Sequence, residues 1–186
     1  YYHYDTPYTP DFTGLDTFKG MVIHPQHWPK DLDYTNKKVV VIGSGATAMT
    51  LVPAMADDAA SVTMLQRSPT YVVARPDQDK IANTLRKLLP DSMAYALTRF
   101  KNTQLQHFMY QRMRKEPTKM KKALVGMVSD ALGPDYDVEK HFTPKYNPWD
   151  QRLCLIPNGD LFKSIKKGKT QVITDHIDTF TANGIT

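Results

Sequence analysis

A glycine-rich turn is the part of this sequence best suited to chemistry. It has the spacing G-x-G-x-x-A from Gly43 to Ala48 and directly follows four β-branched residues at 39–42. Gly43 allows a tight turn, Gly45 lets a ligand approach the backbone, and Ala48 keeps the next helix close to the strand. The helix predicted over 46–57 points its free N–H groups and positive dipole end at that ligand. The residues predicted to hold a dinucleotide pyrophosphate through their main chain are Gly43, Ser44, Gly45, Ala46 and Thr47.

The end of the next predicted strand, 61–65, indicates which dinucleotide is bound. An Asp or Glu at this position normally holds a free ribose 2′-hydroxyl, whereas a 2′-phosphate needs a cation and hydroxyl donors. The sequence here is Gln66-Arg67-Ser68, which contains no acid. The planar guanidinium of Arg67 suits a phosphate, and Ser68 adds a hydroxyl. NADP is therefore predicted over NAD, and the alternative is a solvated arginine at a strand end.

The surrounding pattern predicts an α/β protein with a Rossmann-like, three-layer nucleotide-binding domain. The apolar strand at 39–42 is expected to be buried on both faces, as inside a parallel sheet, and a strand at 171–174 is expected to join it. A helical insertion over about 77–150 separates the two halves of this sheet. Its methionine-rich stripe is more simply core than the lining of a substrate channel. Residues 153–156 predict a strand or buried turn, and the tail predicts a small antiparallel turn at Asn183-Gly184.

Composition excludes several classes of protein. The chain has 186 residues, of which 41% are hydrophobic and 23% charged, as in ordinary soluble proteins. No run of eighteen apolar residues and no signal peptide occurs, so a cytoplasmic location is predicted. Cys154 is the only cysteine, which excludes a disulfide within the chain, a thiol redox pair and a cysteine zinc cluster.

The basic charge is concentrated in the predicted helices. Residues 80–122 contain eleven Lys or Arg against two acids, so they carry +9 while the net charge of the chain is +5. Such a stripe could bind nucleic acid or anionic lipid, but a solvated face of amphipathic helices is the simpler interpretation. We expect no nucleic-acid partner, and a weak peripheral membrane contact of these helices stays open.

Residues 1–37 are rich in proline and aromatic residues and are expected to form an extended connector. His24 and His27 could ligate zinc, but Pro25 between them disfavours a helix and a third ligand is not near in the sequence. A hinge at which His24 and Trp28 pack between domains is the simpler interpretation, and no metal is predicted. Because the sequence opens at Tyr1 without Met and ends on a β-like segment, we expect it to be part of a longer protein.

The connector contains an unusual pattern, F-x-G-x-x-x-H-x-x-x-W-P. Together with residues 66–71 and 147–153, it resembles the fingerprint of the type I Baeyer-Villiger monooxygenases, a branch of the flavin-containing monooxygenases, and especially the ethionamide-activating group. The resemblance implies that 38–186 is the NADPH-binding domain of an FAD enzyme, and that 1–37 is the linker and the edge of an FAD domain. The fingerprint residues, which the resemblance implies form a hinge, are Phe18, Gly20, His24, Trp28 and Pro29.

The resemblance also implies a reaction and a catalytic residue. In this family NADPH reduces FAD, oxygen adds to the flavin, and one oxygen atom passes to a ketone, giving an ester, or to sulfur. Arg152 matches the catalytic arginine, and its alternative role is an ion pair with Asp150. Gln151 stands where many relatives place Lys, so its contact to the 2′-phosphate is in doubt and selectivity is expected to rest on Arg67.

Three alternatives concern the whole protein. Only Gly43 and Gly45 form a G-x-G, so the parts that bind FAD are expected outside this chain. An N- or S-oxidising flavin monooxygenase, or an NADP-binding module without activity of its own, stay open. A flavin disulfide reductase lacks its cysteine pair. The individual substrate and the oligomeric state do not follow from the sequence.

Overall fold

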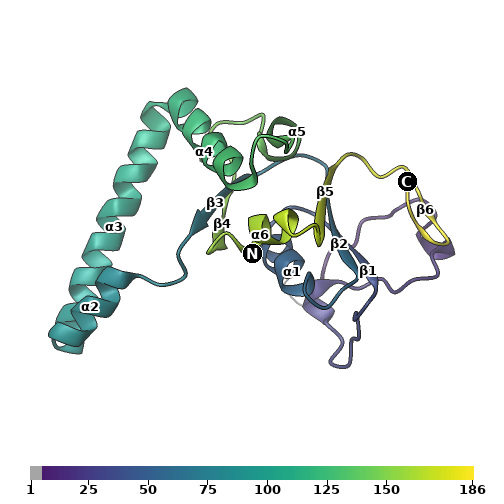
Figure 1. Cartoon of the computed structure of the whole chain (residues 1–186), viewed down its shortest axis with the longest axis horizontal. Coiled ribbons are helices and arrows are strands. Elements are labelled where there is room, and N and C mark those ends of the chain that lie inside the picture. The colour runs from purple at the N-terminus through teal and green to yellow at the C-terminus, as the bar shows by residue number, and fades with distance from the viewer. Residues whose placement is uncertain (1–5) are drawn as a thin grey trace.

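The computed structural model describes residues 6–186 as an α/β fold (Figure 1). The first five residues of the connector predicted over 1–37 lie outside this range. The strands are β1 (Lys38–Ile42), β2 (Ser61–Gln66), β3 (Tyr71–Arg75), β4 (Leu153–Pro157), β5 (Thr170–Thr174), β6 (Phe180–Thr181) and β7 (Gly184–Ile185). The helices are α1 (Ala46–Met55), α2 (Lys80–Leu88), α3 (Asp91–Lys115), α4 (Pro117–Leu132), α5 (Val138–Phe142) and α6 (Asp160–Lys166).

The central sheet is parallel and has the strand order β1-β2-β5, which confirms the three strands predicted for it. The register places Val41 beside Met64 and Met64 beside Val172. Met64 and the α1 residue Val52 are completely buried in the main core. Since the strands are parallel, β1, β2 and β5 all end at one edge of the sheet, and the residues that follow them gather there.

The prediction that residues 39–42 are buried on both faces is wrong. Strand β1 lies at the edge of the sheet, and only alternate residues such as Val39 and Val41 pack against the core. Val40 and Ile42 point to the opposite face and are 46% and 45% exposed. A continuous run of β-branched residues predicts a strand, but it does not show whether other helices or strands cover both faces of that strand.

Strands β3 and β4 form a second, separate parallel pair. No strand was predicted at residues 71–75, so β3 was missed, whereas the strand or buried turn expected at 153–156 is confirmed as β4. Tyr71, the first residue of β3, pairs with Leu153 and is almost fully buried. The pair therefore brings the segment after β2 next to the segment that precedes β4.

The helical insertion has its predicted position and consists of α2 to α5. Helix α3 projects away from the two sheets, with α2 beside its outer end and α4 returning toward β3 (Figure 1). The expectation of a buried apolar stripe holds near α4, where Met113 is buried beside Leu124. It is wrong at the outer end, where Leu88 and Phe100 are 74% and 67% exposed. Within residues 6–186, no helix is both long and apolar enough to cross a membrane.

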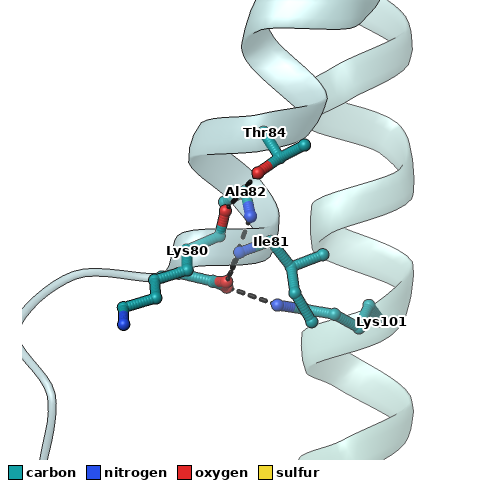
Figure 2. Close-up of polar contacts among 6 residues, drawn as sticks. Lys80, Ile81, Ala82, Thr84 and Lys101 are labelled. Carbon is teal, nitrogen blue, oxygen red and sulfur yellow. Dashed lines mark hydrogen bonds and ion pairs between the residues drawn. The ribbon is translucent and has the colours of Figure 1, made fainter.

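The start of helix α2 is fixed by Asp79. Its carboxylate accepts hydrogen bonds from the main-chain N–H groups of Ile81 and Ala82, each at 3.1 Å, and so caps two free donors of the first turn. Lys101 of α3 forms an ion pair with the same carboxylate. Figure 2 shows Lys101 reaching from α3 toward Ile81 at this point. These contacts join the two helices of the projecting part and lower the pKa of Asp79 to about 2, chiefly through the hydrogen bond from Lys101.

The C-terminal hairpin confirms the predicted antiparallel turn, but its tip lies one residue earlier than Asn183-Gly184, because Gly184 belongs to β7. Strands β6 and β7 pair Thr181 with Gly184, so that residues 182–183 form the tip. The connector runs against this hairpin: the main-chain N–H of Lys19 donates to the carbonyl of Ala182 at 3.1 Å. The connector is thus attached to the end of the described chain, far from it in sequence.

Candidate functional site

The glycine-rich turn lies at the carboxyl edge of the central sheet, between β1 and α1. Gly43 has φ of 123°, which favours glycine, and its N–H donates to the carbonyl of Leu65 at 2.7 Å. Gly45 caps α1, and its carbonyl accepts the N–H of Met49 at 3.0 Å. A side-chain carbon added at Gly43 or Gly45 would meet no atom within 4 Å. The turn therefore has open space in front of it, next to the positive end of a ten-residue helix.

The turn after β2 lies against this glycine turn, as the βαβ pattern requires. The Ser44 hydroxyl faces the carbonyl of Ser68 at 3.5 Å, and Ser44 itself is buried. Arg67 and Ser68 are exposed. In the part of the chain that is described, neither a hydrogen bond nor an ion pair occupies the guanidinium of Arg67. Arg67 is thus a cation available to a ligand in the open space.

The segment that carries Arg152 reaches the same place. Cys154, near the start of β4, is buried with its sulfur 3.9 Å from the carbonyl oxygen of Ser44. The carbonyl of Arg152 lies 3.5 Å from the Thr70 hydroxyl in the turn after β2. The side chains of Gln151 and Arg152 are exposed. Three segments that are far apart in the sequence, 43–45, 67–70 and 151–154, therefore meet at one edge.

The alternative ion pair between Arg152 and Asp150 does not form. Asp150 instead binds Arg114 of α3 at 2.6 Å and accepts the N–H of Asn147 at 3.3 Å. Over residues 6–186, the guanidinium of Arg152 has no hydrogen bond or ion pair. Like Arg67, Arg152 is therefore a cation without an ion-pair partner among the described residues, in a segment that reaches the glycine turn.

Sequence reasoning missed the hydroxyl groups that hold these segments together. The Thr70 and Tyr146 hydroxyls are 2.9 Å apart, and the Tyr146 hydroxyl donates to the Arg152 carbonyl at 3.2 Å. Tyr71 donates to the Tyr146 carbonyl at 2.6 Å. The only sequence signal was the position of Thr70 and Tyr71 immediately after the arginine turn. Tyr146, 76 residues later than Thr70, gives no signal without the fold.

A cluster of polar residues, Gln66, His141 and Thr174, holds the end of β2 in place. The amide of Gln66 donates to the His141 carbonyl at 2.7 Å and to the Thr174 hydroxyl at 2.9 Å. The His141 ring nitrogen Nδ1 lies 2.8 Å from the same hydroxyl. Burial lowers the pKa of His141, which favours its neutral form. Gln66 is almost fully buried, and its amide nitrogen makes two hydrogen bonds. The residue directly before Arg67 is therefore held in place.

The five fingerprint residues make their contacts within the connector and with the C-terminal hairpin. The ring of Phe18 contacts that of Phe180 with centroids 5.9 Å apart, and a side chain at Gly20 would meet the Phe18 ring at 2.4 Å. His24 accepts the N–H of Gln26 at 3.3 Å. Trp28 contacts Tyr34 edge to face at 6.5 Å. The carbonyl of Pro29 accepts the N–H of Leu32 at 3.3 Å. Across residues 6–186, no three His, Cys, Asp or Glu side chains are placed to hold a metal ion.

The geometry defines a class of protein: a parallel α/β domain with a dinucleotide-type turn and two free arginines at the carboxyl edge. The family described as FMO-like, flavin-binding monooxygenase-like, matches residues 2–133. The chain belongs to this family.

Several known proteins are similar to the chain over its full length. The chain is 57% identical to the FAD-containing monooxygenase EthA of Mycobacterium tuberculosis and 54% identical to that of Mycolicibacterium smegmatis, over 186 residues in each case. It is 53% identical to the probable FAD-binding monooxygenase AlmA of Acinetobacter baylyi. These matches cover 100% of the chain but 37 to 38% of each relative, so the chain spans less than two fifths of their length.

Solved structures of lower identity show the same fold. An oxidised steroid monooxygenase bound to NADP matches 97% of the chain and 41% of its own, with a TM-score of 0.69 and 19% identity. The cyclohexanone monooxygenase of Rhodococcus sp. Phi1, bound to NADP⁺, covers the same shares with a TM-score of 0.68 and 19% identity. These likenesses confirm the α/β fold with a parallel sheet.

Proposed function

We propose that residues 38–186 bind NADPH in a longer, FAD-dependent monooxygenase that inserts one oxygen atom from O₂ into ketones, giving esters, and that also oxidises sulfur. The observation that carries this proposal is the meeting of the glycine turn, Arg67 and Arg152 at one edge of the sheet. The names of the relatives and the NADP in the similar structures support it.

The glycine turn fits the pyrophosphate of NADPH. Space is open at Gly43 and Gly45, and the first N–H groups of α1 have no partner within a helix, as at any helix start. A phosphate there accepts hydrogen bonds from the main chain and gains from the helix dipole. The buried Ser44 hydroxyl is already directed to Ser68, so it stiffens the turn instead of binding the ligand.

Arg67 fits the 2′-phosphate that distinguishes NADPH from NADH. Its guanidinium is exposed and unpaired within the described residues, and Gln66 beneath it is held rigidly. A planar fork can give two parallel charge-assisted hydrogen bonds to a phosphate. Ser68 offers a hydroxyl beside it. Gln151 can add at most a neutral contact, so the preference for NADPH rests mainly on Arg67.

Arg152 supplies a permanent positive charge near the nucleotide. FAD, held mainly by parts of the protein outside this chain, supplies the redox chemistry with O₂ when it is bound. The guanidinium of Arg152 stays protonated at working pH and can stabilise a negatively charged oxygen group that faces it. Residues 1–37 act as linker to the FAD domain in this proposal, with His24 at the hinge.

The full-length Arg152→Ala enzyme tests this assignment. We expect NADPH to reduce its flavin at close to the normal rate while ester formation from a ketone is lost. Flavin reduction is followed by absorbance in the absence of O₂, and ester by gas chromatography. Arg86→Ala, a matched change at an exposed arginine of α2, should leave both steps unchanged. Normal ester formation by Arg152→Ala would contradict the catalytic role.

Two other functions remain distinguishable from this one. An N- or S-oxidising flavin monooxygenase would oxidise amines or sulfides but form no ester. An NADP-binding module without activity would carry no flavin, so the purified full-length protein would lack the yellow flavin spectrum. The histidine-containing fingerprint at 18–29 favours the ketone-oxidising branch.

The membrane contact of the basic helices also stays a proposal. Phe100 and Phe108 are 67% and 57% exposed on α3, in a region of strongly positive charge, and this combination fits a surface of anionic lipid. Sedimentation of the full-length protein with phosphatidylglycerol vesicles tests it. Binding should weaken in high salt, and absence of binding at low salt would reject it.

A further inference from the structure

The main-chain carbonyl of Arg152, the arginine assigned above as catalytic, accepts a hydrogen bond from one hydroxyl group, and that hydroxyl is itself bonded to a second one. The Tyr146 hydroxyl donates its single proton to the carbonyl of Arg152 at 3.2 Å. It therefore acts as acceptor toward the Thr70 hydroxyl, 2.9 Å away. The Thr70 oxygen is also 3.5 Å from the Arg152 carbonyl. The three groups form a closed triangle at the point where the segment 147–152 enters β4.

The ring of Tyr146 is itself fixed. Tyr71 packs edge to face against it with centroids 5.3 Å apart, and the Tyr71 hydroxyl donates to the Tyr146 carbonyl. Burial raises the pKa of Tyr71 to about 12, so this phenol stays a donor at working pH. Thr70 and Tyr71 are almost fully buried. The triangle is thus built on a rigid base, although the segment it holds lies in a loop.

The same triangle continues into the proposed phosphate-binding turn. Thr70 follows Ser68 with only Pro69 between them, and the ring of Pro69 fixes its own φ. Ser68 faces Ser44 of the glycine turn, and Arg67 precedes it. Residues 67–68 are therefore joined by a short path to Thr70, Tyr146 and the Arg152 carbonyl.

We propose that Tyr146 is a positioning residue for Arg152 and that, through Thr70, it couples binding of the NADPH phosphates to the placement of that arginine. This inference rests on the proposed function of Arg152. The pairing of β3 with β4 does not need the Tyr146 hydroxyl, because the strand register from Tyr71 to Arg75 holds the two strands together.

Hydrogen exchange of the full-length, FAD-loaded protein tests the coupling without turnover. In wild type, NADP⁺ should slow amide exchange in peptides that cover 43–48 and also in those that cover 150–154. In Tyr146→Phe, which removes one hydroxyl, protection of 43–48 should persist while protection of 150–154 is lost. Tyr110→Phe is the matched control, since the Tyr110 hydroxyl has no hydrogen bond among residues 6–186. Protection of both segments in Tyr146→Phe would overturn the coupling.

The kinetic consequence is a split between two steps. Tyr146→Phe should keep flavin reduction by NADPH at its normal rate but lower the product formed per NADPH by about 2- to 13-fold, the factor for one hydrogen bond, with hydrogen peroxide rising in its place. Thr70→Val should behave alike, and Thr70→Ser should restore coupling because it keeps the hydroxyl. An equal loss in both steps, or unchanged yield of product, would overturn the proposal.

The Arg152→Ala enzyme separates failure of this inference from failure of the function. If Arg152→Ala forms product normally, the proposed function is wrong and this inference falls with it. If Arg152→Ala forms none while Tyr146→Phe matches Tyr110→Phe in exchange and yield, only the positioning role of Tyr146 is wrong.

Discussion

Replacing Arg67 by alanine should remove most of the preference for NADPH over NADH. In the structure Arg67 belongs to the turn that contacts the glycine turn through Ser68. Its side chain is exposed and has no hydrogen bond or ion pair within residues 6–186, so the substitution breaks no internal polar contact. Its effect on folding should therefore be small. Any change in nucleotide affinity then reports on a contact made to the nucleotide itself.

The size of the effect follows from the exposure of Arg67. Hydrogen bonds to charged groups contribute about 1.5–3 kcal/mol, but solvent screens an exposed pair. We take about 2 kcal/mol for the whole fork, which is a factor of about 30 in the dissociation constant. NADH lacks the 2′-phosphate, so its affinity should change less than about twofold, which is about 0.4 kcal/mol.

Calorimetric titration of the full-length protein with NADPH and NADH measures both affinities. Arg75→Ala serves as control, since Arg75 is another exposed arginine at the carboxyl end of a parallel strand. It should leave both affinities unchanged. An equal loss for NADH and NADPH in Arg67→Ala, or no loss for either, would refute the assignment of Arg67 to the 2′-phosphate.

Three further predictions test other parts of the site and fold. Gly45→Ala adds a carbon to open space at an ordinary φ, so we expect the poorer helix cap to cost at most about 1 kcal/mol of stability. The added carbon should nevertheless weaken binding of NADPH at least tenfold in a titration. Unchanged affinity would mean that the phosphates bind elsewhere. Asp79→Ala should lower the melting temperature above pH 4, and the difference from wild type should shrink as the pH falls toward 2. The reason is that the pKa of Asp79 in the folded protein is lowered to about 2, so its stabilising charge is lost as the pH approaches that value. A difference that does not depend on pH would argue against the charged cap. The Cys154 thiol is buried and burial raises its pKa, so a thiol reagent at pH 8 should modify it far more slowly in the native than in the urea-unfolded protein, and equal rates would contradict its place beneath the glycine turn.

Local sequence was sufficient to predict the elements on either side of the glycine turn. The run before Gly43, the strand that ends before Arg67 and the helix between them are adjacent in sequence, so spacing alone predicts a βαβ unit and its binding edge. The helical insertion predicted over about 77–150 is likewise marked by local proline and glycine residues, and helices α2 to α5 lie within it. The strands and helices among these predictions are confirmed, because the physical cause of each lies within its own segment.

Contacts between distant segments could not be predicted in the same way. Strand β3 was missed because its partner, β4, follows the whole insertion, and strand pairing depends on burial more than on residue preference. The Thr70–Tyr146 contact and the Cys154–Ser44 contact join residues 76 and 110 positions apart. The exposed Phe100 shows the same limit from the other side, since helical periodicity marks a face but not what covers it.

A structure of the full-length protein with bound NADP⁺ tests most directly whether the glycine turn and Arg67 bind the phosphates of the nucleotide. We expect the pyrophosphate to bind the main-chain N–H groups of residues 44–47, and the 2′-phosphate to lie within hydrogen-bonding distance of the Arg67 guanidinium. Nucleotide bound at another place, with Gly43 and Gly45 facing side chains of the protein instead of phosphate, would contradict it.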